Sequence, residues 1–193
     1  MSLEKGILGY LSMKPMSGYD IKRLFDMSAA FFWPADQAQI YRSLKKLTDE
    51  GSIELTEYLQ GETVNSKVYS ITENGNRVFR EWLLDLQKSD FISRLPFVMH
   101  LFFSGALTPE EQLVCIEEQR RVNNEFTQNL MENYQENGDL FAELAGLPEG
   151  DRKLEAAMYA YRWGVLRGEA YGKLLEEIKE DIKGKKTDDK KEE

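Results

Sequence analysis

Residues 37–72 decide the fold of this chain. They begin with Gln37-Ala-Gln-Ile-Tyr-Arg-Ser-Leu-Lys-Lys-Leu-Thr-Asp-Glu50, followed by Gly51 and by two strand-like segments, 52–60 and 64–72. The first stretch predicts a short helix, because Ile40, Leu44 and Leu47 recur at i, i+4 and i+7 and share one face. Basic and amide side chains crowd the opposite face. We therefore expect a helix with an apolar back and a basic front, followed by a β-hairpin.

The neighbouring segments predict the remaining helices of a winged helix-turn-helix, in the order in which that fold has them. Residues 3–11 and 18–28 predict two short helices, and Ser17 is a good N-cap for the second. Thr72 is the expected N-cap of a helix through residue 87, whose predicted buried residues are Val78, Phe79, Trp82, Leu83 and Leu86. The predicted fold class is therefore mainly α: a winged helix-turn-helix with a two-stranded wing, plus an α-helical dimerisation domain. In a winged helix, the third helix lies in the major groove of DNA.

The residue types on the front of the third helix suit DNA. Glutamine and arginine can read base edges, whereas lysine neutralises phosphate. The expected base readers are Arg42, Gln39 and Gln37, and the expected phosphate contacts are Ser17, Tyr19, Tyr41, Lys45, Lys46 and Lys67. A solvated helix face is the alternative for the third helix, and a plain exposed turn is the alternative for the hairpin tip, whose one basic residue is Lys67.

The net charge of −9 is unevenly distributed. Residues 1–95 carry 12 basic and 13 acidic residues, whereas residues 96–193 carry 13 basic and 21 acidic ones. The acidity therefore lies away from the expected DNA surface, and a near-neutral domain can still present a basic face.

Beyond a break at 88–96, the chain predicts only helices. Thr108-Pro-Glu-Glu111 is a strong helix start, and the helix it opens is expected to end near Asn133. A loop at 137–150 and a second long helix to about Ile182 should follow. We predict a winged-helix domain at 1–88, a helical dimerisation domain at 96–183 and a disordered tail at 184–193. Two such helices cannot bury both faces alone, so we expect a homodimer.

Small residues recur every four positions in the last helix, at Ala160, Gly164, Gly168 and Gly172. Each glycine costs about 1 kcal/mol of helix stability relative to alanine, which favours a close helix crossing. We interpret the stripe as the dimer interface; the alternative is that it makes room for neighbouring aromatic residues.

Aromatic residues cluster in three segments, and a small flat effector could stack among them. The candidate effector residues are Trp33, Phe97, Tyr159 and Trp163, with ordinary core packing as the alternative.

Catalysis has little support in the sequence. The one histidine, His100, lies in an apolar run and is expected to be a core or interface residue. There is no spaced set of zinc ligands, no phosphate loop and no nucleophile elbow, so we predict no enzyme, metal or other cofactor. No apolar run reaches the roughly 18 residues of a membrane span. A single cysteine, Cys115, and the lack of a signal segment favour the cytoplasm.

Several motifs together resemble the PadR family of transcriptional regulators. They are Ile7-Leu-Gly-Tyr-Leu-Ser12, Pro15-Met-Ser-Gly-Tyr-Asp-Ile-Lys22, Gln39-Ile-Tyr-Arg-Ser-Leu-Lys-Lys-Leu47, Glu50-Gly51, Lys67-Val-Tyr-Ser-Ile-Thr-Glu-Asn-Gly75 and Trp82-Leu83. The second half is similar, by pattern only, to the helical domain of the family's virulence-activator-like branch. One departure is Asn65-Ser66-Lys67, where relatives often have Pro-Arg-Lys.

The resemblance implies a homodimer that binds a palindromic operator in double-stranded DNA, usually as a repressor relieved by a small aromatic or drug-like effector. The alternative is a DNA-binding regulator controlled through protein interaction instead of a small molecule.

Overall fold

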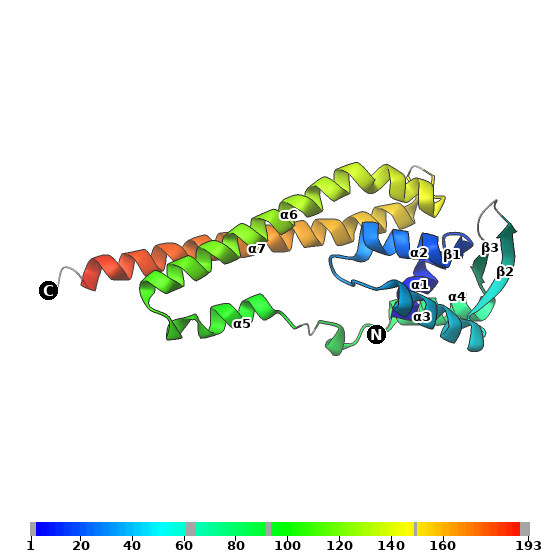
Figure 1. Cartoon of the computed structure of the whole chain (residues 1–193), viewed down its shortest axis with the longest axis horizontal. Coiled ribbons are helices and arrows are strands. Elements are labelled where there is room, and N and C mark those ends of the chain that lie inside the picture. Colours follow the sequence, from blue (N-terminus) through cyan, green and yellow to red (C-terminus); the bar gives the residue numbers. More distant parts are fainter. Residues whose placement is uncertain (1–2, 61–64, 92–93, 149, 190–193) are drawn as a thin grey trace. The chain divides into compact units, whose positions relative to one another are not determined.

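The computed structural model describes residues 3–60, 65–91, 94–148 and 150–189 (Figure 1). The chain forms two compact units. Unit 1 comprises Met1–Ile92 with Glu136–Ala157, and unit 2 comprises Ser93–Gln135 with Met158–Glu193. Neither unit is continuous in sequence, because the two longest helices each contribute residues to both.

Four helices of unit 1 start where local signals place them. They are α1 (Leu3–Leu11), α2 (Gly18–Leu24, continued by a π-helical turn η1 at Phe25–Ala29), α3 (Gln37–Asp49) and α4 (Glu73–Leu84). Ser17 caps α2 by accepting a hydrogen bond from the Asp20 N–H, and Thr72 caps α4 by accepting one from Gly75. Both predicted N-caps are thus confirmed.

The sheet has one strand more than the predicted hairpin. Strands β2 (Ile53–Gln60) and β3 (Asn65–Ile71) form the hairpin, and the short β1 (Met16–Ser17) pairs antiparallel with β3, giving the order β1-β3-β2. The sequence did not predict a strand at Met16, since two residues carry no alternation that would reveal one. This pairing joins the start of α2 to the wing.

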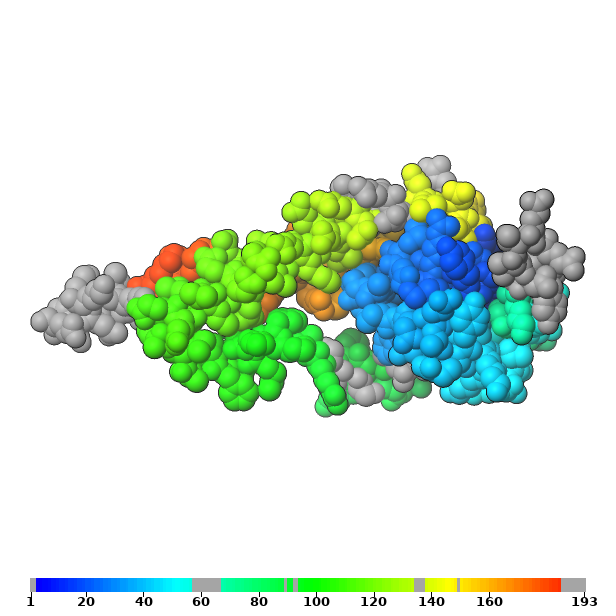
Figure 2. Space-filling model, viewed as in Figure 1, coloured from blue at the N-terminus to red at the C-terminus, as the bar shows by residue number. Residues whose placement is uncertain are grey.

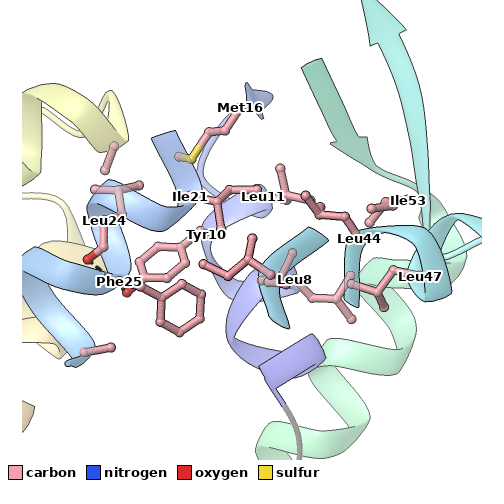
Figure 3. Packing of buried hydrophobic residues seen from close by; sticks show 14 of the residues in the cluster. Leu8, Tyr10, Leu11, Met16, Ile21, Leu24, Phe25, Leu44, Leu47 and Ile53 are labelled. Atoms are coloured by element: carbon pink, nitrogen blue, oxygen red, sulfur yellow. Dashed lines mark hydrogen bonds between the residues drawn. The ribbon is translucent and has the colours of Figure 1, made fainter. Parts of the chain in front are cut away.

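The core of unit 1 lies among α1, α2, α3 and the sheet (Figure 3). Ile7, Leu8, Ile21, Leu24 and Leu44 have no exposed surface. The Tyr10 ring packs edge-on against Phe25 with centroids 4.8 Å apart, and its hydroxyl lies 2.7 Å from the Ser28 Oγ. This core fixes the orientation of α3 by its apolar side.

Part of the predicted loop at 137–150 is helical and belongs to this core. Helix α6 (Pro109–Ala145) ends twelve residues later than predicted, and the buried Phe141 and Ala145 pack within the unit 1 core. The Lys153 Nζ also donates to the Ser12 carbonyl oxygen at 2.6 Å. Burial of these apolar side chains compensates for the weak helix propensity of the Asn- and Gly-containing segment, which is why the predicted loop is wrong over residues 137–145; the chain leaves the helix at Gly146, within the predicted loop.

Unit 2 is built from α5 (Pro96–Phe103), a 3₁₀ turn η3 (Ser104–Ala106), and parts of α6 and α7 (Arg152–Asp189). Thr108 and Glu111 exchange hydrogen bonds of 3.3 and 2.9 Å at the start of α6, as predicted. Helix α7 ends at Asp189, whereas the sequence predicted a helix to about 182 and then a tail. Extending an existing helix needs no new nucleus, so a charged segment can continue it. None of the described helices has the length and apolarity to cross a bilayer.

Two burial predictions for α4 and the residues after it were wrong. Leu83 is 52% exposed and Leu86 is 71% exposed, whereas Val78, Phe79 and Trp82 are partly buried. The helix ends at Leu84, so Leu86 leaves the helical face on which its spacing had placed it.

Candidate nucleic-acid interface

Helix α3 presents a polar face to solvent. Its apolar residues Ile40 and Leu44 have no exposed surface, while Arg42 and Lys45 are exposed and Tyr41 is 44% exposed. Figure 2 shows the light-blue atoms of α3 on the surface of unit 1. The predicted division of this helix into an apolar back and a basic front is therefore present in the structure.

Gln37 and Gln39 lie in the first turn of α3, and both are exposed. Gln39 takes part in the N-cap of α3. Its Oε1 accepts a hydrogen bond of 2.9 Å from the Asp36 N–H, and its own backbone N–H donates to Asp36 Oδ1 at 2.7 Å. This reciprocal cap occupies the amide oxygen of Gln39. Bidentate reading of adenine needs both the oxygen and the nitrogen of an amide. Gln37 is therefore better suited to that contact.

Lys46 forms an ion pair within unit 1. Its Nζ donates to Glu4 Oε1 at 3.0 Å and lies 4.0 Å from Glu50 Oε1. The hydrogen bond from Lys46 to Glu4 raises the pKa of the lysine, with a further contribution from Glu50. The acidic partners offset its charge toward a phosphate, which distinguishes Lys46 from Lys45. Sequence reasoning missed Glu4, which lies 42 residues away in α1.

The start of α2 adjoins α3 through a glycine. A Cβ at Gly18 would lie 2.8 Å from Tyr41 Cε1, so only glycine lets the tyrosine ring lie this close. Tyr19 is 64% exposed beside it. Ser17, by contrast, is buried, and its hydroxyl donates to Asp20 Oδ2 at 2.6 Å. The Ser17 hydroxyl therefore bonds within the N-cap of α2, whereas we had expected it to contact phosphate.

In the part of the wing that the structure describes, Lys67 is the one basic residue. Lys67 is exposed on β3 and pairs in register with Tyr58 of β2. The predicted tip at residues 61–64 lies outside the described residues, so wing contact stays a prediction.

Two glycines of the small-residue stripe of α7, Gly168 and Gly172, face α6 of the same chain, and the role of the stripe as a dimer interface stays a prediction. A Cβ at Gly168 would overlap Thr127 Oγ1, and the Gly168 carbonyl accepts a hydrogen bond of 2.8 Å from Asn123 Nδ2. Gly172 also faces Asn123, while Gly164 is buried and Ala160 partly buried. An intrachain helix crossing therefore accounts for Gly168 without a second copy. The sequence could not reveal which helix approaches the stripe.

The four predicted effector residues are divided between the two units, and their role stays a prediction. Trp33 is half-buried in unit 1, and the other three belong to unit 2. Phe97 packs on the Tyr171 ring at 4.7 Å, whereas Tyr159 is 67% exposed and Trp163 is 52% exposed.

His100 is exposed, so it is not a core residue of the single chain, and its expected place in an interface stays a prediction. Within the described part of the chain, no three His, Cys, Asp or Glu side chains are grouped to hold a metal ion.

Comparison with known proteins identifies a family domain in the N-terminal part of the chain. The pattern of the transcriptional regulator PadR-like family matches residues 7–81, which include α3 and the hairpin. A negative transcriptional regulator PadR from Bacillus subtilis is 36% identical over 109 residues, covering 56% of this chain and 60% of that protein.

Solved structures agree with this match over a longer span. Bacillus subtilis PadR in complex with operator DNA superposes with a TM-score of 0.79 at 28% identity, covering 93% of this chain and 98% of that one. The same protein in complex with p-coumaric acid gives 0.76 at 26% identity, covering 94% and 98%. Residues 7–81 therefore carry a PadR-like family domain, and the chain shares the fold of Bacillus subtilis PadR over most of its length.

Proposed function

We propose that this chain is a homodimeric repressor that binds a palindromic operator and responds to a small aromatic effector. The observation that carries the proposal is the exposed front of α3, with Arg42 and Lys45 on a helix whose back is fully buried. A relative of the same fold has been solved on operator DNA. The curated relative is a negative regulator, which supports repression rather than activation.

In this proposal, Arg42 and Gln37 read base edges, and Gln39 assists through its amide nitrogen. Arginine pairs with guanine through two hydrogen bonds, each such pair being worth about 1–3 kcal/mol of discrimination. Tyr19, Tyr41, Lys45 and Lys67 contact phosphates, as does Lys46 to a lesser degree because of its ion pair with Glu4.

A direct test measures binding of the full chain to its own upstream DNA by fluorescence anisotropy. Arg42→Ala should weaken operator binding by about 1–3 kcal/mol while changing binding to unrelated DNA much less. Arg80→Ala is a matched control, because Arg80 is exposed on α4, outside the proposed surface. Equal operator affinity for wild type and Arg42→Ala would refute the assignment of α3 as the reading helix.

The homodimer is supported by apolar surface on unit 2. No residue of α5 is buried, and Met99, Phe102 and Phe103 are 58%, 77% and 61% exposed. Val114 of α6 is also 70% exposed. Soluble monomers rarely expose large contiguous apolar patches, and a second copy of the chain would cover this one. Two recognition helices would then meet half-sites about one helical turn apart.

Sedimentation of the full chain tests the homodimer. Phe102→Asp with Phe103→Asp should shift the chain from dimer to monomer and weaken operator binding. Leu84→Asp, at an equally exposed apolar position of unit 1, should leave the dimer intact. A wild-type monomer at micromolar concentration would refute the proposal.

A further inference from the structure

A groove of about 600 Å³ lies beside α3 in unit 1. Four polar residues of α3 and two aromatic residues of the preceding connector line it: Phe32, Trp33, Gln39, Arg42, Ser43 and Lys46. The four α3 residues share one flank of the helix, because they follow one another at i, i+3, i+4 and i+7. The groove therefore combines aromatic and polar walls next to the proposed reading residues.

The Ser43 hydroxyl is a polar group that the fold leaves unused. The side chain is only 9% exposed, and its hydroxyl forms no hydrogen bond with any of the described residues. The Thr48 hydroxyl, farther along the same helix, instead donates to the Leu44 carbonyl at 2.9 Å. Nearly all buried polar groups in proteins have hydrogen-bond partners. A nearly buried hydroxyl that has none and lines a groove therefore points to a ligand there.

The polar groups of the groove favour an anion. Arg42 is exposed and pairs with no carboxylate in the described part of the chain. Lys46 and its partner Glu4 both line the groove, so that two cations share it with one carboxylate. The Gln39 side chain keeps its nitrogen as a donor, because its oxygen is bonded in the N-cap of α3. Donors thus outnumber acceptors, which suits the oxygens of a phosphate group.

The groove also lies where a DNA strand would pass. An α-helix with its side chains is about 10–12 Å across and the major groove of B-DNA is about 12 Å wide, so a seated helix meets both strands. On one flank of α3, Tyr41 packs on Gly18 at the start of α2, beside the exposed Tyr19. The groove lies on the flank that Lys46 joins to α1 through Glu4. On operator DNA, the two flanks would therefore face different strands.

We propose that this groove seats the sugar-phosphate backbone of one operator strand, and that Ser43 donates a hydrogen bond to a phosphate oxygen there. The inference rests on the proposed function and adds Ser43, Phe32 and Trp33 to the residues that contact DNA. Serine hydroxyls are common donors to DNA phosphates. Lys46 supplies positive charge, while the half-buried Trp33 and the 49% exposed Phe32 pack against the neighbouring deoxyribose.

Fluorescence anisotropy of the full chain with its own upstream DNA tests the groove. Ser43→Ala should weaken binding about ten-fold, because a hydrogen bond to a charged group is lost. Binding to unrelated DNA should weaken alike, and the salt slope should not change, because the hydroxyl carries no charge. Thr48→Val is the matched control and should leave DNA affinity unchanged, since its hydroxyl bonds within the chain and does not line the groove.

Urea unfolding of the same variant separates a DNA contact from a structural role. Ser43→Ala should be at least as stable as wild type, because the hydroxyl has no partner among the described residues and alanine is the better helix former. A clear loss of stability would assign the hydroxyl to the fold and overturn the proposal.

Single methylphosphonate substitutions in the operator identify the phosphate, since each replaces one charged phosphate oxygen with a methyl group. At one phosphate in each half-site, the substitution should weaken wild type much more than Ser43→Ala, because the two changes remove one shared contact. The groove is overturned if Ser43→Ala binds as wild type does, or if its loss couples to no phosphate. It is also overturned if Ser43→Ala turns a dimer into a monomer, because the groove is then a subunit contact. In each case a persisting effect of Arg42→Ala leaves α3 as the reading helix, whereas absence of both effects refutes the proposed function as well.

Discussion

Replacement of Gly168 by alanine should destabilise unit 2, although alanine is the better helix former. A Cβ at this position would overlap Thr127 Oγ1 and lie 3.1 Å from Thr127 Cβ and Cγ2. Thr127 cannot easily move away: it is buried, its χ1 is restricted by β-branching, and its hydroxyl donates to the Asn123 carbonyl at 2.8 Å. The added methyl group should therefore disturb the packing of α6 against α7.

The magnitude follows from two opposing effects. Overpacking of a tight contact costs about 1–3 kcal/mol, and this overlap belongs near the upper end. The better helix propensity of alanine offsets about 1 kcal/mol of this cost. Gly168→Ala should therefore lower the free energy of unfolding by about 1–2 kcal/mol. Gly172→Ala should be neutral or raise it by up to about 1 kcal/mol, because its Cβ would lie 3.4 Å from Asn123 Nδ2, an ordinary contact.

Urea unfolding followed by circular dichroism measures both variants at one fixed protein concentration, since dimerisation would make stability depend on concentration. Adding Thr127→Ala to Gly168→Ala should recover about 1 kcal/mol or more relative to the sum of the single effects, because the two side chains compete for one space. The reasoning is refuted if Gly168→Ala is as stable as Gly172→Ala, or if the double variant is simply additive.

Two further predictions concern charged groups. Glu4→Gln should strengthen binding to DNA of any sequence and steepen the salt dependence of binding by roughly one counterion, because it releases Lys46 from its ion pair. For the same reason, Lys45→Ala should weaken DNA binding more than Lys46→Ala. Anisotropy titrations from roughly 50 to 200 mM salt measure both effects, and an unchanged salt slope for Glu4→Gln would count against the ion pair. Hydrogen bonds from Lys179, and then from Arg120, hold the pKa of Glu117 below its ordinary value of 4.5, so the stabilisation is present at neutral pH and is lost as pH falls through that lowered pKa. Glu117→Gln should therefore flatten the dependence of unfolding free energy on pH below about 4.5, and an unaltered profile would contradict this.

The sequence alone determined the features that depend on near neighbours along the chain. The apolar stripe of Ile40, Leu44 and Leu47 gave the helix and its buried side, because side chains three or four positions apart share a face. The N-caps at Ser17 and Thr72 were predictable for the same reason, since each bonds to an N–H three residues away. Together these local signals predicted the order of elements and hence the winged helix.

Only the tertiary structure decided the features that depend on distant pairs. The ion pair of Lys46 with Glu4, the facing of Gly168 toward Thr127 and the burial of Phe141 in the unit 1 core each join residues from different elements. Periodicity shows that a surface needs a partner, but it does not say which surface meets it. For that reason the sequence marked the glycine stripe as a close contact, but only the packing of α6 on α7 showed that Thr127 is the neighbour of Gly168.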